Sequence, residues 1–342
     1  MIAPMDARTG EACELQYRGV WMQSKHGPIL LVIASLLHGV MALPADAQTT
    51  QPSTPSPSGR RSKRAAAGPR VVRNIPYAEI AGADRRLTSL DIYAPRKGKN
   101  HPVVVWIHGG GWAIGDKGWV GHKPGLFTGE GYLLVSINYR LAPAVTHPTY
   151  VQDVAAAIAW VHRHIKEYGG NPDCILLIGH SAGAHLAALV ATDERRLREA
   201  GSGLGVLKGV VLVDGAGYDI PGQMRLVKDT WLGSLYRSAF GTDPTVWEDA
   251  SPIRHVAKGK GIPPFLILYS GGRLAAGMQA SALADALRTA DVQAEVAGAP
   301  DKNHMTIDRD IGAPKDKPTE RIVEFFRTCT QNRATSRPAD TR

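Results

Sequence analysis

Ser181 is the centre of the pentapeptide Gly179-His180-Ser181-Ala182-Gly183. The apolar run 174–178 before it predicts a buried strand, and the small residues 182–190 after it favour a helix. Gly-x-Ser-x-Gly between a strand and a helix is typical of a nucleophile elbow, a sharp turn that exposes a serine hydroxyl above a sheet. The Ala182 N–H would then lie at a helix N-terminus, where it can stabilise an oxyanion. The pattern predicts a serine that attacks an acyl carbon.

A second glycine-rich segment follows another predicted buried strand, Pro102–Ile107. His108 comes next, and after it three consecutive glycines, 109–111. A flexible turn would explain the glycines if the motif stood alone. Beside a nucleophile elbow, they predict backbone N–H groups that point into a site, with Gly110 and Gly111 joining Ala182 as oxyanion donors.

These motifs resemble the α/β-hydrolase superfamily. Within it, they resemble the esterase/lipase branch that includes hormone-sensitive-lipase-like and bacterial feruloyl-esterase-like enzymes. The resemblance covers about Tyr77 to Phe326. It is carried, in chain order, by His108–Trp112, Gly115–Lys117, Tyr139–Pro143, Asp153, Trp160-Val161, Gly169–Pro172, the elbow, Ser251–Ile253 and Asn303–Met305. It implies hydrolysis of an ester and does not fix the substrate.

The base of the reaction is predicted from chain order, because the chain has twelve histidines. In the resembled enzymes the order is serine, acid, histidine. His304 follows the last predicted strand and has no histidine between it and His255. We therefore expect His304 to be the base, His180 to pack under the elbow, and His108 to make a structural hydrogen bond.

The acid is less well defined. The resemblance implies an aspartate just after the predicted strand Phe265–Tyr269, but Gly272 stands there and no carboxylate follows before Asp285. Asp214 ends the preceding predicted strand, at a place where some lipases of the superfamily carry their acid. We predict Asp214 as the acid.

Two further aspartates are alternatives for the acid. Asp219 matches a position that more often caps the following helix. Asp301 precedes His304 in the same loop, which makes it hard for its carboxylate to reach Nδ1 of that ring.

Strand and helix patterns alternate through the chain and predict one α/β domain over 71–328, with a mostly parallel central sheet flanked by helices. The predicted strands are 89–93, 103–107, 133–138, 174–178, 210–213, 265–269 and 294–297, and the predicted helices include 150–168, 278–289 and 318–326. The resemblance implies that the insertion 218–261 is a small helical cap. Its aromatic residues either line the pocket or anchor the cap: Trp231, Tyr236, Phe240 and Trp247. The resemblance also ties Arg140 into an internal ion pair.

Residues 1–47 predict export. Lys25 and His26 precede an apolar run, 29–43, and Ala45-Asp46-Ala47 offers a signal-peptidase site. We expect residues 1–47 to be removed, with Met22 as a plausible true start, and the protein to be periplasmic or secreted. The run is short for a permanent membrane span.

The chain carries a formal net charge of +9, and much of it lies in the Pro/Ser/Thr-rich stretch 48–70. Without aromatic residues among them, these charges predict a disordered basic linker rather than a nucleic-acid site. A polar, disordered tail is predicted over 329–342. Cys174 and Cys329 could pair in an oxidising compartment, but we expect two unrelated thiols.

No metal-binding spacing is present, and we expect neither metal nor cofactor. The favoured function is hydrolysis of small to medium-sized carboxylic esters, with a small-molecule ester as the only predicted partner; the oligomeric state is left open. An arylformamidase-type amidase, and a decayed hydrolase retained as a binding protein, are the alternatives. A relative of the prolyl oligopeptidases is disfavoured because nothing upstream could form a propeller.

Overall fold

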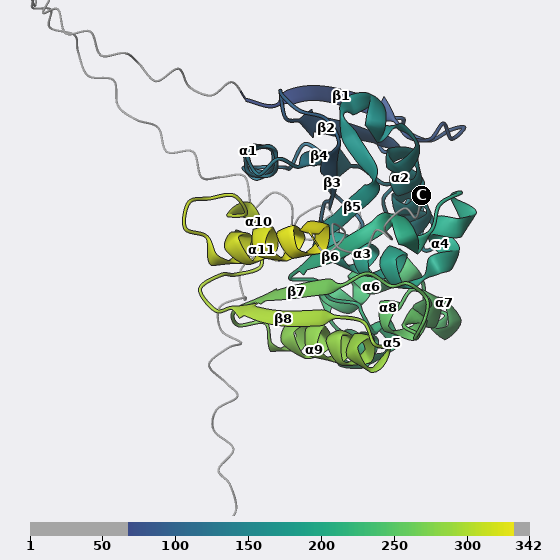
Figure 1. Cartoon of the computed structure of the whole chain (residues 1–342). Helices are drawn as coiled ribbons and strands as arrows, with labels where there is room; N and C mark the ends of the chain where they lie inside the picture. Colours follow the sequence, from purple (N-terminus) through teal and green to yellow (C-terminus); the bar gives the residue numbers. More distant parts are fainter. Residues whose placement is uncertain (1–67, 332–342) are drawn as a thin grey trace, which may run out of the picture. The chain divides into compact units, whose positions relative to one another are not determined.

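The structure is a computed structural model that describes residues 68–331 (Figure 1). The predicted signal peptide, nearly all of the predicted linker and most of the predicted tail lie outside the described residues. The helical cap and the mostly parallel sheet lie within them.

One sheet runs through the domain in the order β1-β2-β4-β3-β5-β6-β7-β8. The pairs β1/β2 and β2/β4 are antiparallel and all other pairs are parallel. The mostly parallel sheet predicted from the alternating patterns is therefore present. Its strands are β1 (Arg70–Pro76), β2 (Ser89–Ala94), β3 (His101–Ile107), β4 (Leu133–Ile137), β5 (Gly170–His180), β6 (Leu207–Val213), β7 (Phe265–Ser270) and β8 (Ala294–Ala299).

Helices cover both faces of the sheet (Figure 1). They are α1 (Lys123–Gly129), α2 (Thr149–His164), α3 (Ala182–Thr192), α4 (Glu194–Glu199), α5 (Ile220–Val227), α6 (Trp231–Phe240), α7 (Pro244–Asp249), α8 (Pro252–His255), α9 (Leu274–Thr289), α10 (Thr306–Arg309) and α11 (Lys317–Gln331), with short 3-10 turns η2 (Ile165–Tyr168) and η3 (Leu204–Val206).

Strand β3 contributes side chains to a hydrophobic core on each face of the sheet, because successive residues of a strand point to opposite faces. Val103 and Val105 share a core with α2, α3 and α9. Val104 and Trp106 belong to a second core, on the other face, with residues of α1 and α11. A parallel strand buried on both faces reads as a continuous apolar run, which is why the sequence alone identified this strand.

The amphipathic pattern of α2 is confirmed, since its predicted apolar face is fully buried: Val151, Val154, Ile158, Val161 and Ile165. The α-helix ends at His164 and a 3-10 turn continues to Tyr168. Gly169 then adopts the left-handed conformation (φ 93°) and ends the helix as expected.

Several elements differ from the sequence expectations. The edge strand β1 and the helix α1 were not predicted; α1 contains Pro124, Gly125 and Gly129, which are poor helix formers. Helix α9 begins four residues before the predicted start at Met278, and α11 extends to Gln331, past the predicted end at Phe326.

The insertion between β6 and β7 is helical and forms α5 to α8. Tyr236 and Phe240 are buried and lie edge-on against Trp112, so they anchor the insertion to the body of the domain. Trp247 is half-buried and donates a hydrogen bond to the Gly241 carbonyl, whereas Trp231 is 77% exposed. Anchoring, rather than lining a pocket, therefore explains the buried aromatics.

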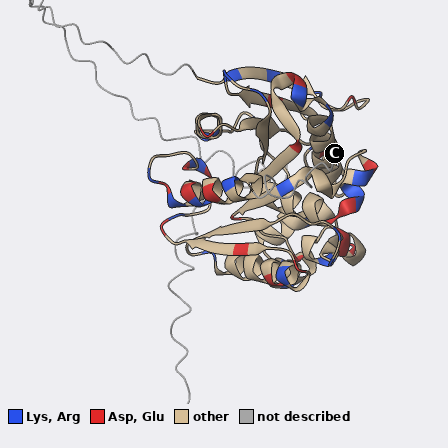
Figure 2. Ribbon diagram, in the orientation of Figure 1, with Lys and Arg blue, Asp and Glu red and all other residues tan. Residues whose placement is uncertain are grey.

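Positions of Lys and Arg and positions of Asp and Glu are interspersed along the ribbon of the described domain (Figure 2). Arg140 makes the internal ion pair that the resemblance implied, with two hydrogen bonds of 2.7 and 2.9 Å to the buried Asp153 carboxylate. Cys174 and Cys329 carry thiols rather than a disulfide. Within 68–331, no helix has the length and apolar character needed to cross a membrane.

Candidate active site

The Gly-His-Ser-Ala-Gly segment forms a tight turn between β5 and α3. Ser181 has φ 54° and ψ −118°, an uncommon conformation for a residue with a side chain. A Cβ at Gly179 would overlap the backbone of Gly183, and a Cβ at Gly183 would overlap the Ile107 carbonyl. Glycine is therefore required on both sides of the serine, because helix and strand approach each other closely there.

His304 lies in the loop between β8 and α10. Its Nε2 is 3.1 Å from Ser181 Oγ, although the two residues are 123 positions apart in the chain. The predicted nucleophile and base are thus within hydrogen-bond distance. With the proton on Nδ1, Nε2 has a free lone pair and accepts the hydrogen bond from the serine hydroxyl.

Asp214 follows β6 directly and faces the other nitrogen of the His304 ring. Its Oδ2 lies 2.7 Å from His304 Nδ1, and its side chain is completely buried. The Ser270 N–H donates to Oδ1 at 2.9 Å and the Ser270 hydroxyl donates to Oδ2 at 2.8 Å. Burial would raise the pKa of Asp214, but hydrogen bonds from His304, Ser270 and Arg273 outweigh it and hold that pKa well below its usual value. The carboxylate is therefore ionised at neutral pH.

The other predicted candidates for the acid lie elsewhere. Asp219 forms an ion pair with Arg254 at 3.3 Å; it occupies the N-cap position of α5, but its side chain makes no capping hydrogen bond. Asp301 is exposed. Within the described domain neither has a hydrogen bond to His304. Gly272, at the position where the resemblance implied the acid, has φ 73°.

Arg273 is a member of the site that was not singled out from the sequence. Its Nη1 lies 2.7 Å from Asp214 Oδ2 and 2.7 Å from His304 Nδ1, and it also donates to the Asp214 carbonyl at 3.0 Å. The sequence offered one signal for a role of Arg273: it directly follows Gly272, the glycine at the position where the resemblance implied the acid.

The glycine loop after β3 lies beside the elbow. Gly110 has φ 111°, which favours glycine, and a Cβ there would overlap the Ile114 carbonyl. Within 68–331, no hydrogen bond uses the N–H of Gly110, Gly111 or Ala182. Free donors at these three positions are what the predicted oxyanion site requires. Leu235 of α6 lies against Gly111, so the cap borders this loop.

His108 and His180 are both buried, and each contacts the backbone of a loop of the candidate site. His108 Nδ1 is 2.8 Å from the Gly109 carbonyl, and His180 Nε2 is 2.8 Å from the His304 carbonyl. Burial is the largest influence on both rings and lowers the pKa of each to about 4, so both are neutral at pH 7. Their expected structural roles agree with these contacts.

An ion pair between a buried lysine and a partly buried aspartate lies beside the loop that carries the base. Lys123 Nζ lies 2.7 Å from Asp308 Oδ1 and 4.2 Å from the centre of the Trp106 ring. The other Asp308 oxygen is 3.8 Å from His180 Nδ1. Lys123 is buried, and this burial lowers its pKa while Asp308 acts in the opposite direction. The pair links α1 to α10, just after the base.

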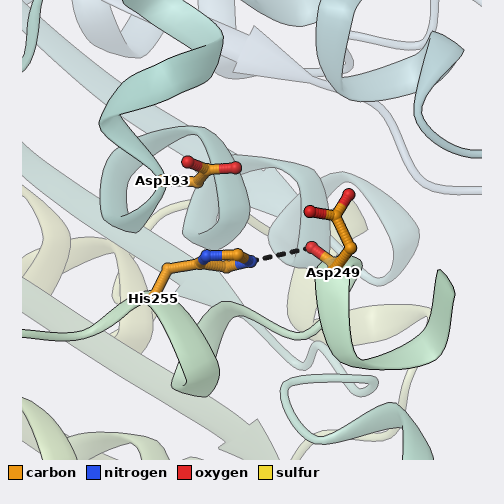
Figure 3. Close-up of side chains that lie close together, drawn as sticks. All are labelled: Asp193, Asp249 and His255. Atoms are coloured by element: carbon orange, nitrogen blue, oxygen red, sulfur yellow. Dashed lines mark hydrogen bonds between the residues drawn. The ribbon is translucent and has the colours of Figure 1, made fainter. Parts of the chain in front are cut away.

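One group of side chains in the described domain has the composition of a metal site: Asp193, Asp249 and His255 (Figure 3). Arg195 lies 2.8 Å from both carboxylates. Arg196 lies 3.0 Å from Asp193 and 2.5 Å from Asp249, and His255 Nε2 is 2.8 Å from the Asp249 carbonyl. Because two guanidinium groups already neutralise the two carboxylates, the group suits a structural link between α4 and α7 better than a cation site. That the chain uses no metal stays a prediction.

Solved structures of similar fold identify the fold class. A truncated carbohydrate esterase from gut microbiota aligns over 77% of this chain and 99% of its own, with a TM-score of 0.65 and 21% identity. Esterase B from Lactobacillus rhamnosis, in an inhibited form, aligns over 80% and 92% with a TM-score of 0.67 and 22% identity. These likenesses establish the α/β-hydrolase fold.

The sequence comparisons place the chain more narrowly. The family model described as BD-FAE matches residues 90–273, more than half of the chain. The chain therefore belongs to the BD-FAE family of the α/β-hydrolase superfamily, in agreement with the resemblance read from its motifs.

Curated relatives match a similar part of the chain. Esterase LipQ of Mycobacterium tuberculosis is 33% identical over 212 residues, which is 57% of this chain and 47% of that protein. A probable carboxylic ester hydrolase, LipM, of the same organism is 35% identical over 204 residues, or 56% and 46%. A probable isoprenylcysteine alpha-carbonyl methylesterase of Oryza sativa is 35% identical over 178 residues, or 50% and 39%. The chain spans about half the length of the curated relatives it matches.

Proposed function

We propose that the protein is a serine esterase that cleaves carboxylic esters of small to medium size through an acyl-enzyme on Ser181. The observation that carries the proposal is the continuous line of contacts from Ser181 Oγ through the His304 ring to the buried Asp214 carboxylate, with distances of 3.1 and 2.7 Å. Similarity to proteins named as esterases supports the same reaction.

In the proposed mechanism, His304 Nε2 removes the hydroxyl proton as Ser181 Oγ attacks the ester carbonyl carbon. The resulting imidazolium is stabilised by the Asp214 carboxylate. The free N–H groups of the glycine loop and of Ala182 hold the negative oxygen of the tetrahedral intermediate. The imidazolium then protonates the leaving alcohol, and water hydrolyses the acyl-enzyme with His304 as base again.

The test compares hydrolysis of p-nitrophenyl acetate and butyrate by the wild-type protein, Ser181→Ala and a control, Ser281→Ala. Ser281 is an exposed serine of α9 without a role in the proposed site. We expect turnover by wild type and control and its loss in Ser181→Ala, with unchanged thermal unfolding in all three. Undiminished turnover by a folded Ser181→Ala protein would contradict the proposal.

The alternatives are separated by the same proteins. An arylformamidase-type amidase would hydrolyse a formanilide faster than the matching ester. A decayed hydrolase acting as a binding protein would hydrolyse neither. That alternative was motivated by the absence of an acid at Gly272, and the contact between Asp214 and His304 supports the active esterase instead. We keep export to the periplasm or the medium as a proposal that rests on residues 1–47 alone.

A further inference from the structure

The inner end of the candidate site holds three polar atoms at mutual hydrogen-bond distance. Arg273 Nη1, Asp214 Oδ2 and His304 Nδ1 lie 2.7 Å from one another. A guanidinium always carries its protons, so Nη1 is a donor and Oδ2 an acceptor. The ring nitrogen Nδ1 has either one hydrogen or one lone pair in this direction, and it cannot serve both neighbours.

Two states of His304 follow. In the first, Nδ1–H donates to Asp214, and Nε2 is free to accept the proton of Ser181. In the second, Arg273 donates to the lone pair of Nδ1, and the ring proton sits on Nε2, where it blocks proton removal from the serine. The carboxylate favours the first state and the guanidinium favours the second.

The other ionisable groups near the ring are compensated or neutral. His180 stacks beside it, with ring centres 4.6 Å apart, and its low pKa of about 4 makes it neutral at pH 7. Behind His180, Asp308 is paired with Lys123. Within the described domain, Arg273 is thus the cation in contact with the His304 ring.

We propose that Arg273 is a positioning residue that acts through Asp214 and His304 and limits protonation of the catalytic histidine. This inference rests on the proposed esterase mechanism. Its positive charge, next to Nδ1, opposes the addition of a second proton to the ring, whereas the Asp214 carboxylate favours it. Asp214 keeps its place without the arginine, because both of its oxygens are also held by Ser270.

The experiment measures kcat/KM for p-nitrophenyl butyrate against pH for the wild-type protein, Arg273→Met and Arg273→Lys. Met preserves the unbranched stem and removes the charge, and the side chain of Arg273 is 34% exposed, which leaves room for the change. On the acidic side of this profile, kcat/KM falls to half its maximum at a midpoint pH, which we call the midpoint of the acid limb. We expect this midpoint to rise by about one pH unit or more in Arg273→Met and to stay near the wild-type value in Arg273→Lys. KM for this neutral ester should not change.

Arg288→Met is the matched control. Arg288 lies in the last turn of α9, the helix that Arg273 directly precedes, and pairs with Asp285 at 3.0 Å on the surface, so its removal should leave the acid limb in place. A merely structural role of Arg273 would lower kcat without moving the limb. An unmoved or lowered midpoint in Arg273→Met would overturn the inference. If Arg273→Met does not fold, Arg273→Gln removes the same charge and is measured in the same way.

A readout without turnover separates this inference from the proposed function. In the Ser181→Ala background, NMR titration of the His304 ring, assigned by the loss of its signal in His304→Asn, should show the ring protonating at higher pH once Arg273 is replaced by Met. Retained turnover in Ser181→Ala would refute the esterase mechanism. Identical titrations with and without Arg273 would refute the role of Arg273 alone.

Discussion

Asp214→Asn is the substitution whose effect can be worked out in most detail. The Ser270 N–H donates to Asp214 Oδ1 at 2.9 Å and needs an acceptor there. An asparagine would keep its oxygen at that place, which puts its NH₂ group against His304 Nδ1 and removes the acceptor to which Arg273 Nη1 and the Ser270 hydroxyl now donate. The amide then donates to Nδ1, and the ring proton moves to Nε2, the nitrogen that must take the proton from Ser181.

The size of the loss follows from this wrong tautomer. In serine proteases with a Ser-His-Asp triad, the same exchange lowers kcat by about 10⁴. We expect a loss of about 10³ to 10⁴ in kcat for p-nitrophenyl butyrate, or about 4–5.5 kcal/mol in the activation free energy. KM should change little, because the lost interaction acts in the transition state. Far-ultraviolet circular dichroism and thermal unfolding serve as controls for folding. A kcat within about fivefold of wild type would refute Asp214 as the acid and make Asp219→Asn and Asp301→Asn the next variants to measure.

The double variant Asp214→Asn/Gly272→Asp tests whether an aspartate at position 272, where the resemblance implied the acid, can replace Asp214. A Cβ at Gly272 has open space around it, but φ is 73°, so any side chain there is strained. Aspartate tolerates this conformation better than most residues, and the neighbouring guanidinium of Arg273 would attract its carboxylate. We expect at most a small recovery of kcat, and full recovery would show that the strain is negligible.

The remaining predictions concern stability and processing. Lys123→Met removes the ion-pair partner of the partly buried Asp308 carboxylate, so the free energy of unfolding should fall by up to about 3 kcal/mol in urea titrations. An unchanged value would show that the ion pair does not stabilise the loop that carries His304. Asp249 has a pKa held well below its usual value, chiefly by its hydrogen bond to His147; its contribution to stability is present above the ordinary carboxyl pKa and is lost as the pH falls toward the lowered one. The unfolding temperature of the wild-type protein should therefore fall as the pH drops below about 4, and it should fall less steeply in Asp249→Asn. Parallel plots of unfolding temperature against pH for the two proteins would contradict this. Protein purified from the native host should begin at Gln48 on N-terminal sequencing, and a folded protein that begins at Met1 or Met22 would contradict cleavage.

The parts of the structure that the sequence could predict are those with a strong local pattern. The buried strands around the elbow are continuous apolar runs, and glycines mark the turns where backbones meet. Asp214 was predicted because it ends the strand before the one that the resemblance associates with the acid, at a place where some lipases of the superfamily carry theirs. The structure places it against His304, as this reasoning expected.

Other features depend on contacts that no local pattern encodes. Strand β1 is an exposed edge strand with one face in solvent, and its residues show no run of apolar side chains. Lys123 is buried only because Asp308, 185 positions away, and the Trp106 ring provide its partners. Arg273 looked like an ordinary loop residue, since its proximity to His304 depends on where two loops meet at the sheet edge.

The most direct test of the central claim is to map the residue that a fluorophosphonate probe modifies. An activated serine reacts with this probe, whereas a serine without a working base does not. Peptide mass spectrometry should find the adduct on Ser181 in the wild-type protein and in Ser281→Ala, and should find none in Ser181→Ala or in folded His304→Asn. Modification of another residue, or undiminished labelling of Ser181 without His304, would contradict the proposed active site.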